Sequence, residues 1–174
     1  MKATGVVRRI DDLGRIVIPK EIRRNLRIRD GESLEIFVDG DNIVLKKFSI
    51  MKNIDEYASN LVLALHSLIK KSVVITDGDS IIACSGNVRE LLNKSISERM
   101  SSCIKRRESI LERYNKELVI TDDFSVECKY VINSIIANGD CIGLVIIFDS
   151  DEIGDDDMLI ASLASKILSK SIEE

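Results

Sequence analysis

The chain has 174 residues, of which 45% are apolar and 31% charged, so it can bury one good hydrophobic core or two small ones. Charged residues close to the first methionine leave no room for a signal peptide, and no apolar run approaches the ~20 residues of a membrane span, so we expect a soluble cytoplasmic protein. The net charge of −4 is distributed unevenly along the chain. Residues 1–50 carry eleven Lys/Arg against eight Asp/Glu, and residues 51–174 carry fourteen against twenty-one, so the first segment is the one suited to a polyanion.

Residues 1–48 predict two strand pairs on either side of a short helix. Runs rich in β-branched residues at 5–10 and 15–18 flank a turn that holds a glycine, and they predict the first pair. Residues 34–38 and 43–47 flank a second turn and predict another hairpin. A unit of this size is too small to enclose a core alone, and with neither metal nor disulfide to staple it, we expect it to dimerise.

The short helix is predicted over residues 20–26, because Pro19 fixes φ at a position where a helix needs no N–H. Ile22 and Leu26 are four residues apart, so both would face inward. The two arginines between them would then face outward.

The remainder of the chain predicts an α+β domain whose helices cover one face of a sheet. Asn53 is the expected cap of its first helix, and Ser95 with Glu98 forms a capping box for the second. The Asn138-Gly139 pair is the strongest hairpin signal in the chain. Helices are expected over 54–69, 95–105 and 155–172, and strands over 72–76, 80–84, 118–121, 131–137 and 142–148.

The last predicted helix has a wide apolar stripe. We expect this helix to pack against the helix at 54–69 and against copies of both in other chains. The stripe consists of Leu159, Ile160, Leu163, Ala164, Ile167 and Leu168.

Catalytic and metal-binding signals are weak. The single histidine, His66, lies mid-helix, and no phosphate-binding glycine motif occurs. The acidic run 149–157 fails as an EF-hand loop because isoleucines fall at ligand positions, and the helix dipole explains it better. We therefore expect no enzyme, no metal and no cofactor. The cysteines, which form no C-x-x-C pair and are expected to be reduced thiols, are Cys84, Cys103, Cys128 and Cys141.

Basic residues dominate the start of the chain, with nine among the first 29 residues against three acids. A guanidinium fork matches phosphate oxygens and the guanine edge, so this segment is typical of a nucleic-acid binder. A solvated face with weak ion pairs to Asp11, Asp12 and Glu21 is the plainer alternative. Placement on two strands and a short helix, doubled by a dimer, favours DNA. The candidate contacts are Arg8, Arg15, Arg23 and Arg24.

The segments that carry those arginines resemble a known family. Residues 1–5 (MKATG), 8–24 (RRIDDLGRIVIPKEIRR) and 34–38 (LEIFV) are similar to the AbrB-type transition-state regulator domain, over essentially residues 1–50. The resemblance implies a swapped-hairpin β-barrel in which two chains interleave their strands. It also implies that the four arginines contact double-stranded DNA.

The resemblance continues downstream into regulators that add a C-terminal GAF domain. Its segments are 92–97 (LNKSIS), 137–140 (ANGD) and 142–148 (IGLVIIF). It implies a DNA-binding domain at 1–50, a linker at 51–55, and a GAF-like regulatory and oligomerisation domain at 56–174.

In function, the resemblance implies a transcription regulator of endospore formation that acts on forespore genes as activator or repressor. Paired dimers would associate through the GAF helices into a homotetramer. The cyclic-nucleotide signature of GAF signalling enzymes is not evident, so a small-molecule ligand stays open. Two other classes also stay open, an antitoxin-type autorepressor and a thiol redox sensor or enzyme with a GAF fold.

Overall fold

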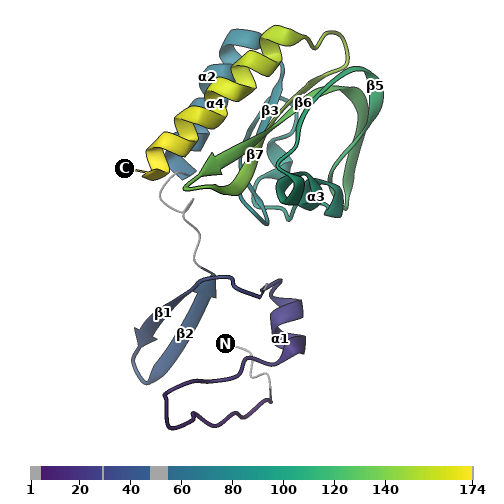
Figure 1. The fold of residues 1–174 in the computed structure, drawn as a ribbon. Helices are drawn as coiled ribbons and strands as arrows, with labels where there is room; N and C mark the ends of the chain where they lie inside the picture. Colours follow the sequence, from purple (N-terminus) through teal and green to yellow (C-terminus); the bar gives the residue numbers. More distant parts are fainter. Residues whose placement is uncertain (1–4, 29, 48–54, 174) are drawn as a thin grey trace. The chain divides into compact units, whose positions relative to one another are not determined.

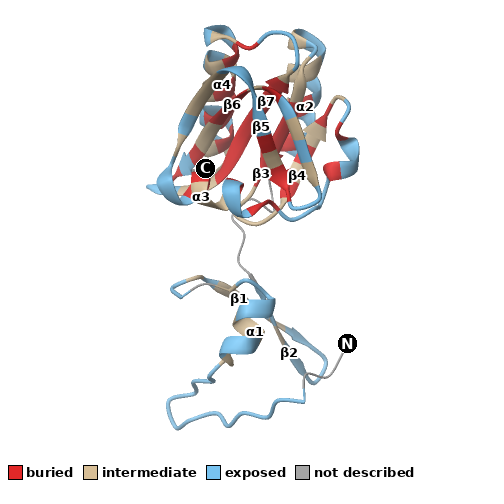
Figure 2. Ribbon diagram, turned by 90° about the vertical axis from the view of Figure 1, so that its right-hand side faces the viewer, coloured by how far each residue is buried: buried red, intermediate tan, exposed pale blue. Residues whose placement is uncertain are grey.

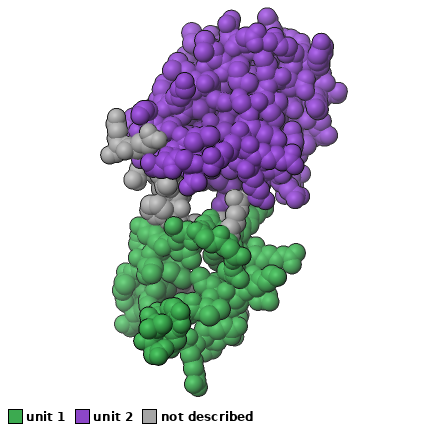
Figure 3. Space-filling view, viewed as in Figure 1, with its two compact units in different colours: residues 1–48 green, residues 49–174 purple. Residues whose placement is uncertain are grey.

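A computed structural model of the chain describes residues 5–28, 30–47 and 55–173. The chain divides into two compact units, residues 1–48 and 49–174, which Figure 3 distinguishes by colour. The predicted cap Asn53 and most of the predicted linker at 51–55 lie outside the described residues.

Among its described residues, the first unit contains one short helix and one hairpin (Figure 1). Helix α1 (Lys20–Asn25) follows Pro19, as predicted. Strands β1 (Leu34–Asp39) and β2 (Asn42–Lys47) pair antiparallel, in agreement with the predicted second hairpin.

The predicted strand pair at 5–10 and 15–18 is wrong for the single chain. Residues 5–19 contain no strand. A turn at residues 11–15 is closed by hydrogen bonds from Asp11 N to Arg15 O (3.1 Å) and from Gly14 N to Asp11 O (3.0 Å). An isolated two-stranded hairpin is marginal in water unless another layer covers it. In this chain Val7 is 86% and Val17 72% exposed, so no such layer covers the described residues of this segment.

The described part of the first unit has no hydrophobic core of its own. None of the described side chains between residues 5 and 46 is buried, as the absence of red in this unit shows in Figure 2. The expected orientation of α1 is also wrong in part, because Leu26 is 59% exposed whereas the Arg23 side chain is only 34% exposed. Leu26 has no apolar layer to pack against in one chain, and Arg23 bends back to Asp30.

The second unit is a five-stranded antiparallel sheet with helices on both faces (Figure 1). Its strands are ordered β4-β3-β7-β6-β5. In chain order the elements are α2 (Asp55–Ile69), β3 (Ser72–Thr76), β4 (Ile81–Ser85), the 3₁₀ turn η2 (Arg89–Leu91), α3 (Glu98–Arg106), β5 (Ser109–Thr121), β6 (Phe124–Ala137), β7 (Asp140–Asp149) and α4 (Asp155–Glu173).

Most predicted elements of this unit are present, but β5 and β6 begin earlier than expected. Residues 113–117 of β5 are all exposed and polar, so they lack the apolar alternation that marks a strand. The predicted hairpin at Asn138-Gly139 is confirmed, with both residues in the left-handed region at φ 51° and 84°.

The cap of α3 is Ser97, not the predicted Ser95. The Ser97 Oγ accepts a hydrogen bond from Met100 N (3.2 Å) and donates one to Val119 O (2.7 Å). Ser95 instead forms a β-bridge with Ser80. A tertiary contact to β5 therefore selects the cap.

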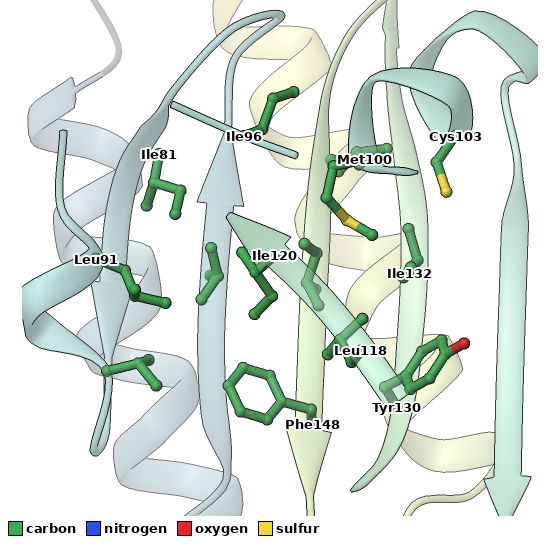
Figure 4. Packing of buried hydrophobic residues seen from close by; sticks show 14 of the residues in the cluster. Ile81, Leu91, Ile96, Met100, Cys103, Leu118, Ile120, Tyr130, Ile132 and Phe148 are labelled. Carbon is green, nitrogen blue, oxygen red and sulfur yellow. The ribbon is translucent and has the colours of Figure 1, made fainter. Parts of the chain in front are cut away.

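Helices cover both faces of the sheet, whereas the sequence predicts one covered face. Helices α2 and α4 pack together on one face, over side chains such as Val73 and Ile147. Helix α3 and the loop before it cover the other face, where Met100 points toward Ile120 and Ile132 (Figure 4). With two faces buried, β3 and β7 are apolar at most positions.

The apolar stripe of α4 is divided between the core and the surface. Ala164 and Leu168 are buried against the sheet, but Leu159, Leu163 and Ile167 are 69%, 58% and 45% exposed. Only part of the predicted stripe therefore packs within one chain. In the described part of the chain, no helix is long and apolar enough to cross a membrane.

Candidate nucleic-acid interface

Arg15 lies on a loop that Asp11 organises. The Asp11 Oδ1 accepts hydrogen bonds from the backbone N–H groups of Leu13 (3.1 Å) and Arg15 (2.7 Å). Its Oδ2 accepts one from the Arg15 Nε at 2.7 Å. The Arg15 backbone N–H, together with its guanidinium, holds the pKa of the Asp11 carboxyl below its usual value, so the carboxylate stays charged at neutral pH. The Arg15 side chain is 72% exposed, which leaves the outer end of its guanidinium to solvent.

Arg8 and Arg24 present less constrained guanidinium groups. Both residues are exposed. Arg8 donates from Nη1 to the carbonyl of Val7 at 3.1 Å, and the described residues offer the Arg24 side chain no ion pair. These two arginines can therefore bring their full positive charge to an anionic partner.

Arg23 is held inside the first unit. Its Nη1 is paired with Asp30, and its Nε is buried without a hydrogen-bond partner. Arg23 therefore links α1 to Asp30 within this unit, in addition to any contact with DNA.

The sequence predicts all four arginines in the first unit, but not that Asp11 holds Arg15 and Asp30 holds Arg23. It gives Asp11 only the role of a weak surface partner, although its spacing of four from Arg15 and the intervening glycine signal a tight turn. Asp30 lies seven residues from Arg23 and carries no comparable signal.

A cavity of about 410 Å³ in the second unit is lined by both His66 and Cys128. The His66 Nδ1 lies 2.7 Å from the carbonyl of Lys71, to which it donates. Phe124, Phe148 and Asp149 also line this cavity, so apolar and charged groups face the same space. It is large enough for a small metabolite.

The thiols are poorly suited to nucleophilic chemistry. Burial raises the pKa of Cys103 and of Cys128 to about 11 in each case, and it also raises the pKa of Cys84. Each of these thiols is therefore protonated at neutral pH, whereas the thiolate is the reactive form.

Two acids in the first turn of α4 form ion pairs with residues of other elements. Asp155 pairs with Arg113 at 2.6 Å. Asp157 accepts two bonds from Lys71 Nζ (2.8 and 2.7 Å) and one from Gly154 N (2.9 Å). Among the described residues, no group of three or more His, Cys, Asp or Glu side chains is placed to hold a metal ion.

Comparisons with known proteins decide the family. Residues 53–173 match the family model described as stage V sporulation protein T C-terminal, transcription factor. The chain is also 44% identical to stage V sporulation protein T of Bacillus subtilis, over the whole length of both chains. This chain belongs to the stage V sporulation protein T family. The resemblance seen in the sequence is thereby confirmed.

The first unit is also similar to proteins outside this family. It is 56% identical over 48 residues to the transition state regulatory protein AbrB of Bacillus subtilis, a match that spans 28% of this chain and 50% of AbrB. Residues 7–53 also match the family model described as antidote-toxin recognition MazE, bacterial antitoxin. Because the remainder matches the sporulation family, the transcription-regulator interpretation holds over the antitoxin alternative.

The second unit has the GAF fold. It superposes on the GAF domain of an Acinetobacter phosphoenolpyruvate-protein phosphotransferase with a TM-score of 0.58 at 10% identity, covering 73% of this chain and 84% of that one. The predicted α+β class with a GAF-like domain is confirmed. The interleaved barrel of two chains stays a prediction.

Proposed function

We propose that this protein is a cytoplasmic DNA-binding regulator that activates or represses forespore genes during sporulation. The observation that carries the proposal is the placement of the candidate arginines on the one unit whose local charge is positive, in a chain that is acidic overall. Side chains of this type neutralise DNA phosphates and release counterions. The full-length similarity to a sporulation protein supports the same conclusion. The proposed contacts are Arg8, Arg15, Arg23 and Arg24.

The DNA-binding form is a dimer made through the first unit. Its support is the exposed apolar surface, which includes Val7, Val17, Val38 and Ile43, all at least 69% exposed. A unit with no buried side chain among its described residues gains little free energy from folding alone. A second copy would cover these residues and would present each arginine twice along a duplex.

Two such dimers associate through the GAF helices into a tetramer. Leu159, Leu163 and Ile167 are spaced by four residues, so they form one exposed ridge along α4. On the neighbouring helix α2, Leu63 and Leu68 are 51% and 73% exposed. Paired helices with outward leucines are suited to a bundle with another copy of the same pair.

The GAF unit acts without catalysis. Supporting this, the two buried thiols have a pKa of about 11, which keeps the reactive thiolate scarce. Incubation of the purified protein with peroxide or methionine sulfoxide should give no turnover. Turnover that is lost in Cys128→Ser would instead establish the thiol redox alternative.

The cavity beside His66 and Cys128 is the place where the GAF unit could hold a small molecule. A ligand there would change DNA affinity only by binding two conformations of the protein unequally. Native mass spectrometry of the purified protein searches for such a molecule directly, because a retained ligand adds its own mass to the tetramer.

Mapping of bound fragments tests the proposed function. Purified protein is mixed with sheared genomic DNA from its own organism, and bound fragments are sequenced. Enrichment upstream of genes expressed in the forespore is the expected result. Uniform recovery of the whole genome, or recovery of none of it, would overturn the proposal.

A further inference from the structure

Arg15 differs from the other candidate arginines in how its charge is held. Its Nε is committed to the Asp11 Oδ2 at 2.7 Å, while the described residues offer no partner to its two Nη groups. The guanidinium therefore points a fixed pair of N–H donors outward.

The loop around this pair is closed by its own backbone. Two N–H groups bond to the Asp11 Oδ1, and Gly14 has a φ of 76°, which a residue with a side chain adopts only under strain. Because three N–H donors surround the Asp11 carboxylate and lower its pKa, it is ionised at neutral pH. The Arg15 side chain is thus oriented before any partner arrives, which lowers the entropy cost of binding.

The neighbouring carboxylate also decides what Arg15 can recognise. A phosphate is attracted by net charge, and the Asp11–Arg15 pair has almost none to offer. A guanine edge instead presents two neutral acceptors, O6 and N7, which need two correctly spaced donors. The free Nη groups supply those donors, whereas the carboxylate would repel a phosphate.

We propose that Asp11 is a positioning residue that directs Arg15 to the O6 and N7 atoms of a guanine in the major groove. The inference rests on the proposed function, since it requires DNA as the partner. Arg24, exposed and without an acidic partner in the described part of the chain, has the opposite role and binds a phosphate.

A matched pair of substitutions separates positioning from simple charge. In Asp11→Asn the side-chain oxygen can still accept from the backbone, but the ionic tether to Arg15 is removed. Asp12 is exposed and has no hydrogen bond or ion pair among the described residues, so Asp12→Asn removes the same charge one residue away. The probes are a duplex enriched by in vitro selection with the wild-type full chain and a scrambled duplex of equal composition.

Asp11→Asn should tighten binding to the scrambled duplex and lower the ratio of selected to scrambled affinity by about fivefold or more. Asp12→Asn should tighten binding to both duplexes and leave that ratio unchanged. Arg15→Ala should lower the ratio with little change in salt dependence. Arg24→Ala should instead reduce the slope of log affinity against log salt by about 0.9 for each phosphate that the protein no longer neutralises.

Replacing guanines of the selected duplex one at a time by 7-deazaguanine removes a single N7 acceptor. At the guanine that Arg15 reads, this replacement should weaken binding by the wild-type protein and leave binding by Arg15→Ala unaffected. The inference is overturned if Asp11→Asn keeps the wild-type ratio, or if Arg15→Ala changes the salt slope as Arg24→Ala does. If the wild-type protein itself bound none of the duplexes, the proposed function would be overturned. The failure of the inference and the failure of the proposed function therefore give different results.

Discussion

Leu163→Asp tests the assembly surface of α4. Leu163 is 58% exposed in one chain, so the substitution should change the free energy of unfolding of the GAF unit by no more than about 0.5 kcal/mol. In an interface with another copy, a buried leucine contributes about 1.5–3 kcal/mol. In a two-fold symmetric interface both copies carry the substitution. The association should therefore weaken by at least about 3 kcal/mol, or roughly 100-fold in Kd.

Sedimentation velocity of the full chain measures this effect. The wild-type protein should sediment as a tetramer and Leu163→Asp as a dimer at the same concentration. Leu92→Asp is the matched control, because Leu92 is a 45% exposed leucine outside α2 and α4. A tetramer that persists in Leu163→Asp, or one that Leu92→Asp also dissociates, would refute the assignment of the interface to the ridge on α4.

Two substitutions inside the GAF unit test its packing. Lys71→Met should lower the free energy of unfolding by about 3 kcal/mol, because it leaves the Asp157 carboxylate, only 6% exposed, without its cation. Chemical denaturation measures this, and a loss below about 1 kcal/mol would contradict it. Gly143→Ala should cost about 3 kcal/mol or more, since an added Cβ would lie 1.9 Å from the Thr76 carbonyl oxygen between β3 and β7. Gly78→Ala has open space around it and should be neutral; equal melting temperatures for the two glycine variants would refute this packing.

Local turn chemistry made much of the fold predictable from the sequence. The hairpins after residues 39 and 137 depend on residues that tolerate a left-handed backbone, which is a property of the turn itself. The cap of α3 was harder to predict, because Ser95 and Ser97 both precede a helical pattern. Only the hydrogen bond from Ser97 to β5 selects Ser97 as the cap. Strand β5 was underestimated because its middle is exposed and polar.

The first unit shows a different limit. Its apolar runs are rich in β-branched residues, as strands are, but in one chain no layer among the described residues covers them. The dimer proposed for this unit would cover these residues, and the sequence indicates such pairing only through a surplus of apolar residues and not through a local turn or cap signal. The arginines of the candidate site were evident from composition and resemblance, whereas the role of Asp30 became evident only from the structure.

The central claim is that the first unit binds DNA through its arginines. The decisive variant replaces Arg8, Arg15 and Arg24 by alanine and keeps Arg23, which is paired within the unit. A control removes the same charge from the GAF unit, at three exposed lysines without an ion pair among the described residues: Lys94, Lys105 and Lys166.

Fluorescence anisotropy on the selected duplex, measured with the full chain across a series of salt concentrations, compares the two variants with the wild type. Log affinity of the wild type and of the lysine control should fall along the same line with log salt, at about 0.9 per neutralised phosphate. The arginine variant should bind at least about 100-fold more weakly, with a flatter line. Equal affinity and equal slope for the arginine variant and the wild type would contradict the account.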